Sequence, residues 1–354
     1  MRGVHGKMNK QAVKNQNIFS RFLAAWKKNP LISTACVLVV MVILQTLALG
    51  FDYDTVGEWF QRWGKNWINI LRNNAGVGVI ALGMTFVIIS GGIDLAVGST
   101  MVAIGAIIMV LIDSNPNGVL TAMGITGVPA YIIAILVGLL AGCALGTVSG
   151  TLVAKSKIPP FIATLGMMKI CRSVTQHFMQ TISPKVPFDF TAISNTKVSG
   201  EVILPIIYWL VIAVILHIVS RRTPFGRQVY AIGSSEKTAR LSGVNVARVK
   251  ALVYVLMGAL VSVTSVIQVS RIGSMDYANA GSGYEMDAIA AVIVGGTSMS
   301  GGRGSIIGTV MGMLIIAVMN NLLNLWGVPP FLREACKGLI VIVAVMMQKK
   351  ESNA

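Results

Sequence analysis

The sequence predicts an all-α, polytopic membrane protein with about ten transmembrane helices, some of them broken or re-entrant. Of its 354 residues, 54% are hydrophobic and only 12% are charged, whereas charged residues make up about a quarter of an average soluble domain. A transmembrane helix needs about 20 mostly apolar residues, because the bilayer offers its backbone no other hydrogen-bond partners. The chain is long and apolar enough for many such helices.

The apolar stretches of the chain give the predicted spans and the domain boundaries. In order, they lie at 31–49, 76–90, 97–112, 129–153, 161–178, 202–220, 251–269, 284–294, 305–323 and 331–347. We expect the stretches at 76–90 and 284–294 to be broken or partly re-entrant helices, because both are too short to cross a bilayer comfortably. The chain then consists of a basic N-terminal arm (1–30), a transmembrane domain (31–348) and a short tail (349–354).

The distribution of Lys and Arg predicts the orientation, because basic residues are retained on the cytoplasmic side of a membrane. The arm holds seven basic residues and no acidic one, and the segment 221–250 holds seven basic residues opposed only by Glu236. An even number of spans places the arm, the segment 221–250 and the tail on one side. We therefore expect both termini to be cytoplasmic and 221–250 to be a cytoplasmic loop.

The formal net charge of +16 does not indicate nucleic-acid binding, because most basic residues lie where membrane topology requires them. We expect membrane lipid, and no nucleic acid, as a partner of this charge. The first span is too long for the core of a removable signal peptide. Cys36, Cys143, Cys171 and Cys336 lie in or beside spans, without metal-binding or disulfide spacing. We expect no metal and no cofactor bound by this chain.

Two spans carry glycine at every fourth position, which places the glycines on one face of each helix. These residues are Gly138, Gly142, Gly146 and Gly150 in the fourth span, and Gly304, Gly308 and Gly312 at the ninth. Small residues let two helix backbones approach closely in a bilayer, where no hydrophobic force drives association. We interpret both faces as helix-packing surfaces.

The stretch "VIISGGIDLAVGST", residues 87–100, interrupts a run of apolar residues. Gly91 and Gly92 are expected to break the helix, and Gly98 and Ser99 to restart it. An ionisable residue in a membrane is usually functional or paired. Asp94 therefore either caps the restarting helix by accepting its N–H groups or lines a polar pathway.

A second glycine-rich break follows the span at 284–294. It reads "GGTSMSGGRGS", begins at Gly295 and Gly296, and leads into another apolar helix. It lacks the Lys of a phosphate-binding loop, and the three histidines of the chain are scattered. Lys169 and Arg172 are expected to extend toward the membrane surface. With no catalytic arrangement and no chain of acidic and histidine residues for a proton relay, an enzyme and an ion-coupled transporter are disfavoured.

The cytoplasmic segment 221–250 contains a short predicted helix. Ser234 or Ser235 can cap it, Glu236 and Arg240 have the favourable i,i+4 order, and Gly243 marks its end. A helix of about two turns is marginal alone in water and needs a docking surface. We expect this surface to belong to a second protein.

Four motifs occur in order along the chain: "GMTFVIISGGIDLAVGS", "PPFIATLGMM", "TPFGRQVYAIGSSEKTARLSGVNV" and "YEMDAIAAVIVGGTSMSGGRGSIIGT". Together they resemble the permease subunits of bacterial ABC importers for monosaccharides, the ribose, xylose and galactoside branch. The resemblance covers residues 76–347. It does not cover the arm or the stretch "EWFQRWGKNW" at 58–67, whose Trp residues indicate an amphipathic segment at the membrane interface.

The resemblance implies a pair of permeases, either a homodimer or a paralogous heterodimer, in the bacterial cell membrane. It implies a separate cytoplasmic ABC ATPase, which uses ATP and Mg²⁺, and an extracytoplasmic sugar-binding protein. It further implies that Ser235, Glu236, Ala239, Arg240 and Gly243 belong to a coupling helix that docks on the ATPase. Three alternatives stay open: a permease for nucleosides or branched-chain amino acids, an ion-coupled secondary transporter, and a membrane scaffold without transport activity.

Overall fold

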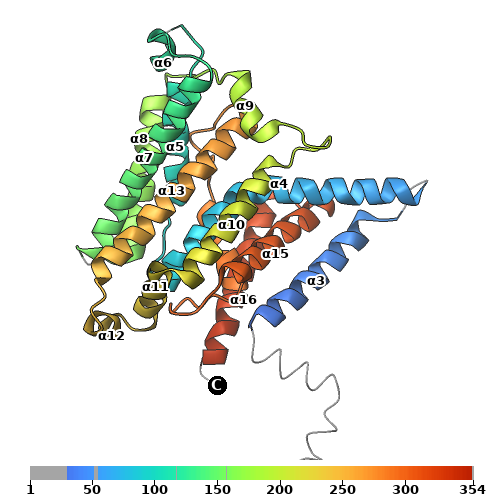
Figure 1. Ribbon diagram of the computed structural model, residues 1–354. Helices are drawn as coiled ribbons and strands as arrows, with labels where there is room; N and C mark the ends of the chain where they lie inside the picture. Colours follow the sequence, from blue (N-terminus) through green and yellow to red (C-terminus); the bar gives the residue numbers. More distant parts are fainter. Residues whose placement is uncertain (1–29, 52–54, 117, 157, 353–354) are drawn as a thin grey trace, which may run out of the picture.

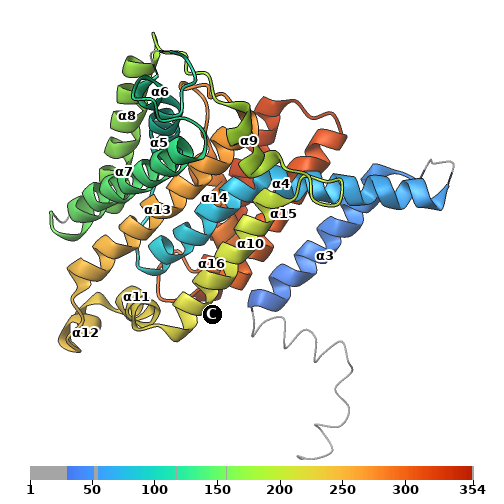
Figure 2. The same cartoon turned by 45° about the horizontal axis from the view of Figure 1, so that its top comes forward.

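The protein is a bundle of α-helices (Figures 1 and 2). It is seen here in a computed structural model that describes residues 30–51, 55–116, 118–156 and 158–352. The predicted N-terminal arm lies outside these residues, apart from its last position. The helices are α3 (Pro30–Leu49), α4 (Val56–Ile89), α5 (Val97–Leu111), α6 (Val119–Ala122), α7 (Val128–Ala154), α8 (Pro160–Met179), α9 (Phe188–Asn195), α10 (Leu204–Arg222), α11 (Pro224–Ser234), α12 (Glu236–Leu241), α13 (Val246–Ile272), α14 (Tyr284–Val294), α15 (Ile306–Leu325) and α16 (Pro330–Ser352).

The predicted fold class is confirmed for the part of the chain that the structure describes, which is helical and contains no named strand. Among the described residues, six helices are long and apolar enough to cross a membrane: α3, α4, α7, α10, α13 and α15. Every one of the ten predicted stretches coincides with a helix. The number of crossings and the orientation of the termini stay predictions.

One predicted span was wrong in length. The stretch at 76–90 was expected to be short, but α4 runs for 34 residues from Val56 to Ile89. The hydropathy pattern did not predict the first half of α4, because the polar and Trp residues there lower its mean hydropathy. The N-terminus of the helix is nevertheless capped, because the Thr55 side chain accepts a hydrogen bond from Glu58 N at 3.2 Å. The short length expected for 284–294 is confirmed by α14, which has 11 residues.

The Trp-rich stretch forms the first half of α4 and packs on α3. Trp59 Nε1 donates to Gly50 O at 3.0 Å, and Trp63 Nε1 donates to Thr46 Oγ1 at 3.1 Å. The rings of Trp59, Trp63 and Trp67 follow one another along the helix at centroid distances of 6.3 and 5.9 Å. In Figure 1 this part of α4 projects from the bundle, and α3 lies beneath it. The aromatic side chains hold the two helices together at this end.

The helix α13 occupies the centre of the bundle, where it packs against α4, α5, α7 and α9. The glycine face of α7 makes its close approach to α13 possible. A Cβ atom on Gly142 would overlap Gly258 O and the Ser262 hydroxyl, and one on Gly146 would overlap Tyr254 O. In the space left by the absent side chains, Ser262 Oγ donates to Gly138 O at 3.0 Å. The two backbones are therefore in direct contact along this face.

The glycine face of α15 is directed at α14 and the second break. A Cβ atom on Gly308 would overlap Gly295 O, one on Gly312 would overlap Ala291 O, and one on Gly304 would lie 2.6 Å from Thr297 Oγ1. Ser305 begins α15 by accepting a hydrogen bond from Gly308 N at 3.0 Å. These contacts hold the end of α14 close to the start of α15.

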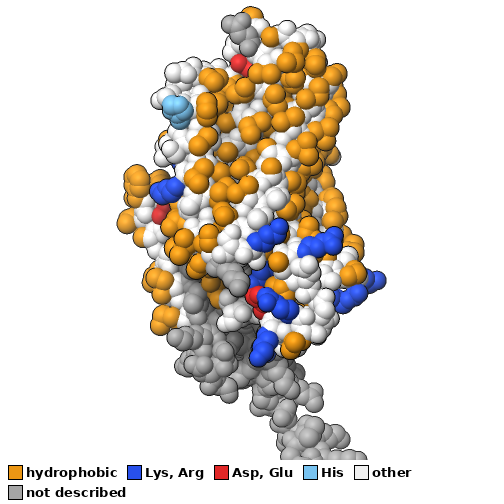
Figure 3. Space-filling model, turned by 90° about the vertical axis from the view of Figure 1, so that its left-hand side faces the viewer, with side chains coloured by type: hydrophobic (Ala, Val, Ile, Leu, Met, Phe, Trp, Pro, Cys, Tyr) orange, Lys and Arg blue, Asp and Glu red, His pale blue; other side chains and the backbone are white. Residues whose placement is uncertain are grey.

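The surface is divided by polarity. Hydrophobic side chains cover the face shown in Figure 3, and Lys and Arg side chains gather toward one end of it. The helices α11 and α12 lie at that end of the bundle, whereas α6 and α9 lie at the opposite end (Figures 1 and 2). This distribution is typical of a protein whose sides face lipid and whose basic end faces the cytoplasm.

Candidate functional site

The loop between α10 and α13 folds into two short helices set at a corner. Thr223 caps α11 by accepting from Gly226 N at 3.2 Å, and Pro224 occupies the first helical position. Ser235 adopts an extended conformation, ends α11 and caps α12 by accepting from Thr238 N at 3.2 Å. Of the two serines considered as caps, Ser235 makes this contact. Ser234 is the last residue of α11.

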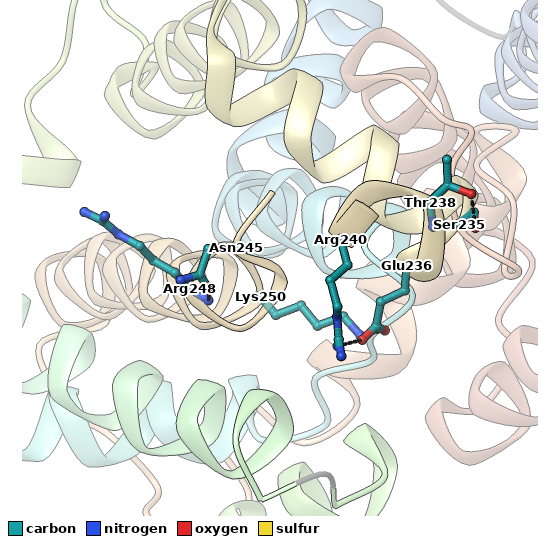
Figure 4. Close-up of polar contacts among 7 residues, drawn as sticks. All are labelled: Ser235, Glu236, Thr238, Arg240, Asn245, Arg248 and Lys250. Atoms are coloured by element: carbon teal, nitrogen blue, oxygen red, sulfur yellow. Dashed lines mark hydrogen bonds and ion pairs between the residues drawn. The ribbon is translucent and has the colours of Figure 1, made fainter. Parts of the chain in front are cut away.

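An ion cluster holds α12 to the start of α13 (Figure 4). Arg240 contacts the Glu236 carboxylate at 3.2 Å, the i,i+4 contact that the sequence indicated, and Lys250 contacts it at 2.6 Å. The hydrogen bond from Lys250, aided by both positive charges, lowers the pKa of Glu236 below its ordinary value of 4.5. Sequence reasoning missed Lys250, because it lies 14 residues away on the next helix.

The helix α12 is anchored on one side and open on the other. Ala239 is buried in the core of the bundle, and Gly243, with a φ of +84°, ends the short helix. Leu241 is 81% exposed at the tip of α12. Leu241 is therefore accessible to another molecule at this end.

The first break lies between α4 and α5. Gly91 has a φ of +81°, which a residue with a side chain rarely adopts. Asp94 is buried, and its Oδ1 accepts from Ala96 N at 2.9 Å. Ala96 is the residue before α5, and the Ser99 hydroxyl donates to its carbonyl oxygen at 2.9 Å. Asp94 thus binds the residue directly before α5, whereas the capping hypothesis expected it to accept from N–H groups of the helix itself. Its role in a pathway stays a hypothesis.

The segment between α13 and α14, residues 273–283, folds into the bundle and reaches the start of α5. A Cβ atom on Gly98 would overlap Gly281 O, so the two backbones touch. Arg172 of α8 donates from Nη1 to Tyr277 O at 3.1 Å and to Ala280 O at 2.8 Å. The expectation that Arg172 extends toward the membrane surface stays a prediction; the structure adds that its guanidinium binds two main-chain carbonyl oxygens of the segment 273–283.

The two breaks and the loop between α10 and α13 meet at one place. Gly302 N, in the second break, donates to Ile89 O, the last residue of α4, at 2.9 Å. A Cβ atom on Gly233 of α11 would overlap both of these atoms. Tyr230, also on α11, donates to Gly304 O at 2.9 Å. We call these five residues the glycine junction.

The chain turns at the first two residues of the second break. Gly296 has a φ of +85°, and Gly295 ends α14 against the backbone of α15. No single motif indicated that this break would contact the first one, because the two segments lie about two hundred residues apart in the chain. The glycine content of both breaks is the only sequence signal of their close approach.

A second group of charges links α14 to α16. Lys337 contacts the Asp287 carboxylate at 3.1 Å and Glu334 at 2.9 Å, and Lys337 and Asp287 are both largely buried. Sequence reasoning did not single out these residues, because Asp287 and Lys337 lie 50 residues apart in the chain; the i,i+3 spacing of Glu334 and Lys337 was the signal available for that pair. Buried charges of opposite sign stabilise each other where water is excluded.

The contacts described above position the helices relative to one another. Among the described residues no group of His, Cys, Asp and Glu could hold a metal ion, and the polar contacts found here are hydrogen bonds to the main chain and ion pairs. The arrangement connects the short helices α11 and α12 at the basic end to two interruptions in the helices of the bundle. It is suited to transmitting movement.

Comparison with known proteins extends this picture. The family model described as "Branched-chain amino acid transport system / permease component" matches residues 66–345. The chain is 41% identical to the ribose import permease protein RbsC of Bacillus subtilis over 81% of this chain and 85% of that protein. It is 35% identical to RbsC of Escherichia coli K12 over 97% and 100%. It is 33% identical to the galactose/methyl galactoside import permease protein MglC of Haemophilus influenzae over 79% and 85%. No solved structure matches the chain.

Proposed function

This chain belongs to the branched-chain amino acid transport system / permease component family, and from that premise we propose that it is the permease subunit of an ATP-driven monosaccharide importer. It is a multi-pass protein of the bacterial cell membrane and forms the translocation pathway. The similar proteins named above import ribose and galactosides. These names favour a monosaccharide over the amino acid or nucleoside alternatives.

The observation that carries the mechanism is the glycine junction. It connects α11, and through it α12, to the last residue of α4 and to the second break just before α15, through the close approach of Gly233 to main-chain atoms and the hydrogen bond from the Tyr230 hydroxyl. Main-chain contacts between helices are short and stiff, because no flexible side chain lies between them. A displacement of α12 is therefore passed to both breaks. The first break adjoins the start of α5, which touches the segment 273–283.

The proposal includes partners outside this chain. A second permease, identical or paralogous, completes the pathway, and a separate cytoplasmic ATPase uses ATP and Mg²⁺ and docks on α12. A sugar-binding protein delivers the substrate on the other side. In this arrangement about ten helices lie in the membrane, some of them broken or re-entrant, and both termini are cytoplasmic; the basic end in Figure 3 supports this orientation. The permease itself makes and breaks no covalent bond.

ATP binding and hydrolysis would move α12, and the junction would carry this movement to the breaks. Such breaks are tolerated in a membrane where the backbone is buried in protein or lines a water-filled path. Movement of the α5 entry relative to the segment 273–283 would open one side of the path while the other is closed. This is a rigid-body switch between outward-facing and inward-facing states.

Transport by the reconstituted system tests this proposal. The permease, its ATPase and its binding protein are placed in vesicles, and uptake of labelled ribose, galactose, leucine and uridine is measured. We expect uptake of a monosaccharide that requires ATP and survives collapse of ion gradients. Uptake of leucine or uridine alone, or uptake driven by an ion gradient without ATPase, would contradict the proposal.

A binding measurement tests the role of α12 separately. Replacing Glu236 and Arg240 with Ala removes the ion cluster that sets the position of α12. We expect less ATPase to co-purify with the variant while the permease inserts at its normal level. A matched control replaces Lys155 and Arg248, which are exposed at the same end and form no ion pair among the described residues. Unchanged co-purification of the Glu236 and Arg240 variant would contradict docking through α12.

A further inference from the structure

Two open hollows lie next to each other where α10 ends and α11 begins. The first, of about 270 Å³, is lined by Ser220, Arg221, Arg227 and Tyr230. The second, of about 340 Å³, is lined by His217, Ile218, Arg221 and Arg222. Arg221 lines both, so they form one surface, which we call the basic hollow. It is large enough for a phosphate group and part of the group esterified to it.

The basic hollow carries positive charge that the described protein does not neutralise. Within the described residues, Arg221, Arg222 and Arg227 form no ion pair. His217 Nδ1 is buried and has no hydrogen-bond partner there. Guanidinium groups bind phosphate oxygens with two parallel hydrogen bonds, which an ammonium group cannot do. The hollow therefore offers donors to an anion and contains no carboxylate that competes for them.

An apolar stripe leads along α10 to this hollow. Its residues recur at intervals of three and four, so they share one face of the helix: they are Ile207, Leu210, Val211, Val214, Ile215 and Ile218, each 40–60% exposed. The opposite face of α10 carries the buried Trp209, which packs on α4. The last residue of the stripe, Ile218, also lines the hollow. The apolar stripe thus ends at the basic hollow.

We propose that the basic hollow binds the phosphate of an anionic phospholipid whose acyl chains lie along this stripe. The proposal rests on the proposed function in one respect, namely that α10 spans the membrane with this end at the cytoplasmic surface. Basic pockets at helix ends on that side bind anionic headgroups. An apolar face 12 residues long, ended by three arginines, matches a molecule with apolar chains and an anionic head.

A second copy of this chain fits the same surface less well. Two identical faces meeting around a two-fold axis parallel to the membrane normal would place their arginine groups against each other. Like charges in such a position repel, and the hollow offers no acidic residue to compensate. A lipid supplies the missing negative charge.

The bound lipid would stabilise the corner that leads to the glycine junction. Tyr230 lines the hollow and donates to Gly304 O on its other side. Neutralising the arginine charges removes repulsion between the end of α10 and the start of α11. The permease is therefore expected to melt at a higher temperature when an anionic lipid is present.

Thermal unfolding of the full-length permease, purified alone in detergent, tests this proposal. Melting is followed with added phosphatidylglycerol, with the same amount of phosphatidylcholine, and with inorganic phosphate. We expect phosphatidylglycerol to raise the melting temperature clearly above the value in phosphatidylcholine. We expect the variant with Arg221→Gln, Arg222→Gln and Arg227→Gln to lose most of this difference. Phosphate alone is expected to reproduce little of it, because it cannot fill the apolar stripe.

A matched variant separates specific binding from general attraction. Lys155→Gln, Lys237→Gln and Arg248→Gln remove the same charge from exposed positions at the same end. This variant is expected to keep the phosphatidylglycerol effect. Equal loss in both variants, an equal effect of the two lipids on the unaltered protein, or full stabilisation by phosphate would overturn the proposal. If the triple arginine variant does not fold, Arg221→Gln alone is used, because Arg221 lines both hollows.

This experiment uses neither the ATPase nor a sugar. Its failure therefore leaves the transport function standing, and failure of the transport assay leaves the lipid result to be judged by itself. Co-purification of the arginine variant with the ATPase is measured separately. If the variant loses ATPase binding but keeps its lipid response, the surface belongs to the ATPase, and the proposal is wrong.

Discussion

Replacing Gly233 with Ala adds one methyl group at the point where three segments meet. The new carbon would overlap Ile89 O and Gly302 N and lie 2.9 Å from the Ile89 carbonyl carbon. All of these atoms are main-chain atoms, so no side chain can rotate away. The hydrogen bond from Gly302 N to Ile89 O, now 2.9 Å long, must lengthen or break.

The size of the effect follows from these contacts. Overpacking a well-filled site costs about 1–3 kcal/mol, and loss of a main-chain hydrogen bond costs about 0.5–1.5 kcal/mol. Ala is also a better helix former than Gly by about 0.5–1 kcal/mol, which works in the opposite direction. Gly166→Ala isolates this last contribution, because Gly166 lies within α8 and no heavy atom would approach its Cβ within 4 Å. The two variants should therefore differ by about 2–4 kcal/mol.

The assay compares Gly233→Ala with Gly166→Ala in folded yield, melting temperature and ATP-driven sugar uptake. We expect Gly166→Ala to match or exceed the unaltered protein in all three. Gly233→Ala should melt at a lower temperature and should transport less sugar per folded molecule. Equal melting of the two variants would refute the close packing of the junction, and normal uptake at reduced stability would refute its role in coupling.

Four further predictions test other parts of the structure. Asp94→Asn should keep most transport because its oxygen can still accept from Ala96 N, whereas Asp94→Leu should cost about 1 kcal/mol and lower the folded yield; normal insertion with no uptake in both variants would indicate a pathway role instead. Gly146→Leu should separate α7 from α13 and reduce the folded yield, and unchanged melting in detergent would contradict the close contact. Gly105→Leu should displace the Met275 side chain and with it the segment 273–283, since even a Cβ at Gly105 would lie 2.5 Å from the Met275 methyl carbon; uptake should fall, and unchanged uptake would show that the segment need not keep this position. The stabilisation from Glu236, whose pKa is lowered, is complete above 4.5 and is lost as the pH falls through the lowered value; Glu236→Gln should remove this pH dependence, and an identical melting profile against pH would contradict it.

Local structure could be predicted from the sequence where one short stretch determines it. Ser235, Glu236 and Arg240 lie within six residues, and their cap and ion pair follow from helix geometry alone. The helix ends at Val294 and at Leu49 agree with the apolar pattern to the residue. Hydropathy failed at the start of α4, because a helix can continue through polar and Trp-rich sequence when another helix covers it.

Contacts between distant segments could not be predicted, because a single sequence does not state which segments are neighbours. Arg172 was interpreted from its position near a helix end, but its partners are main-chain atoms more than a hundred residues away. A glycine in the sequence can indicate a close contact, but it does not identify the atom that is contacted. For this reason the sequence analysis did not single out Gly233, and Gly302 was noted only as part of a glycine-rich stretch; the structure shows that they meet.

The contact between Arg172 and the segment 273–283 has a consequence for how this protein can diverge. Both acceptors are carbonyl oxygens of the main chain, which every amino acid possesses, so the contact demands arginine at 172 and places no demand on the side chains at 277 and 280. Substitutions at the exposed positions of the segment can therefore accumulate and alter the surface that it presents, while its attachment to α8 is preserved.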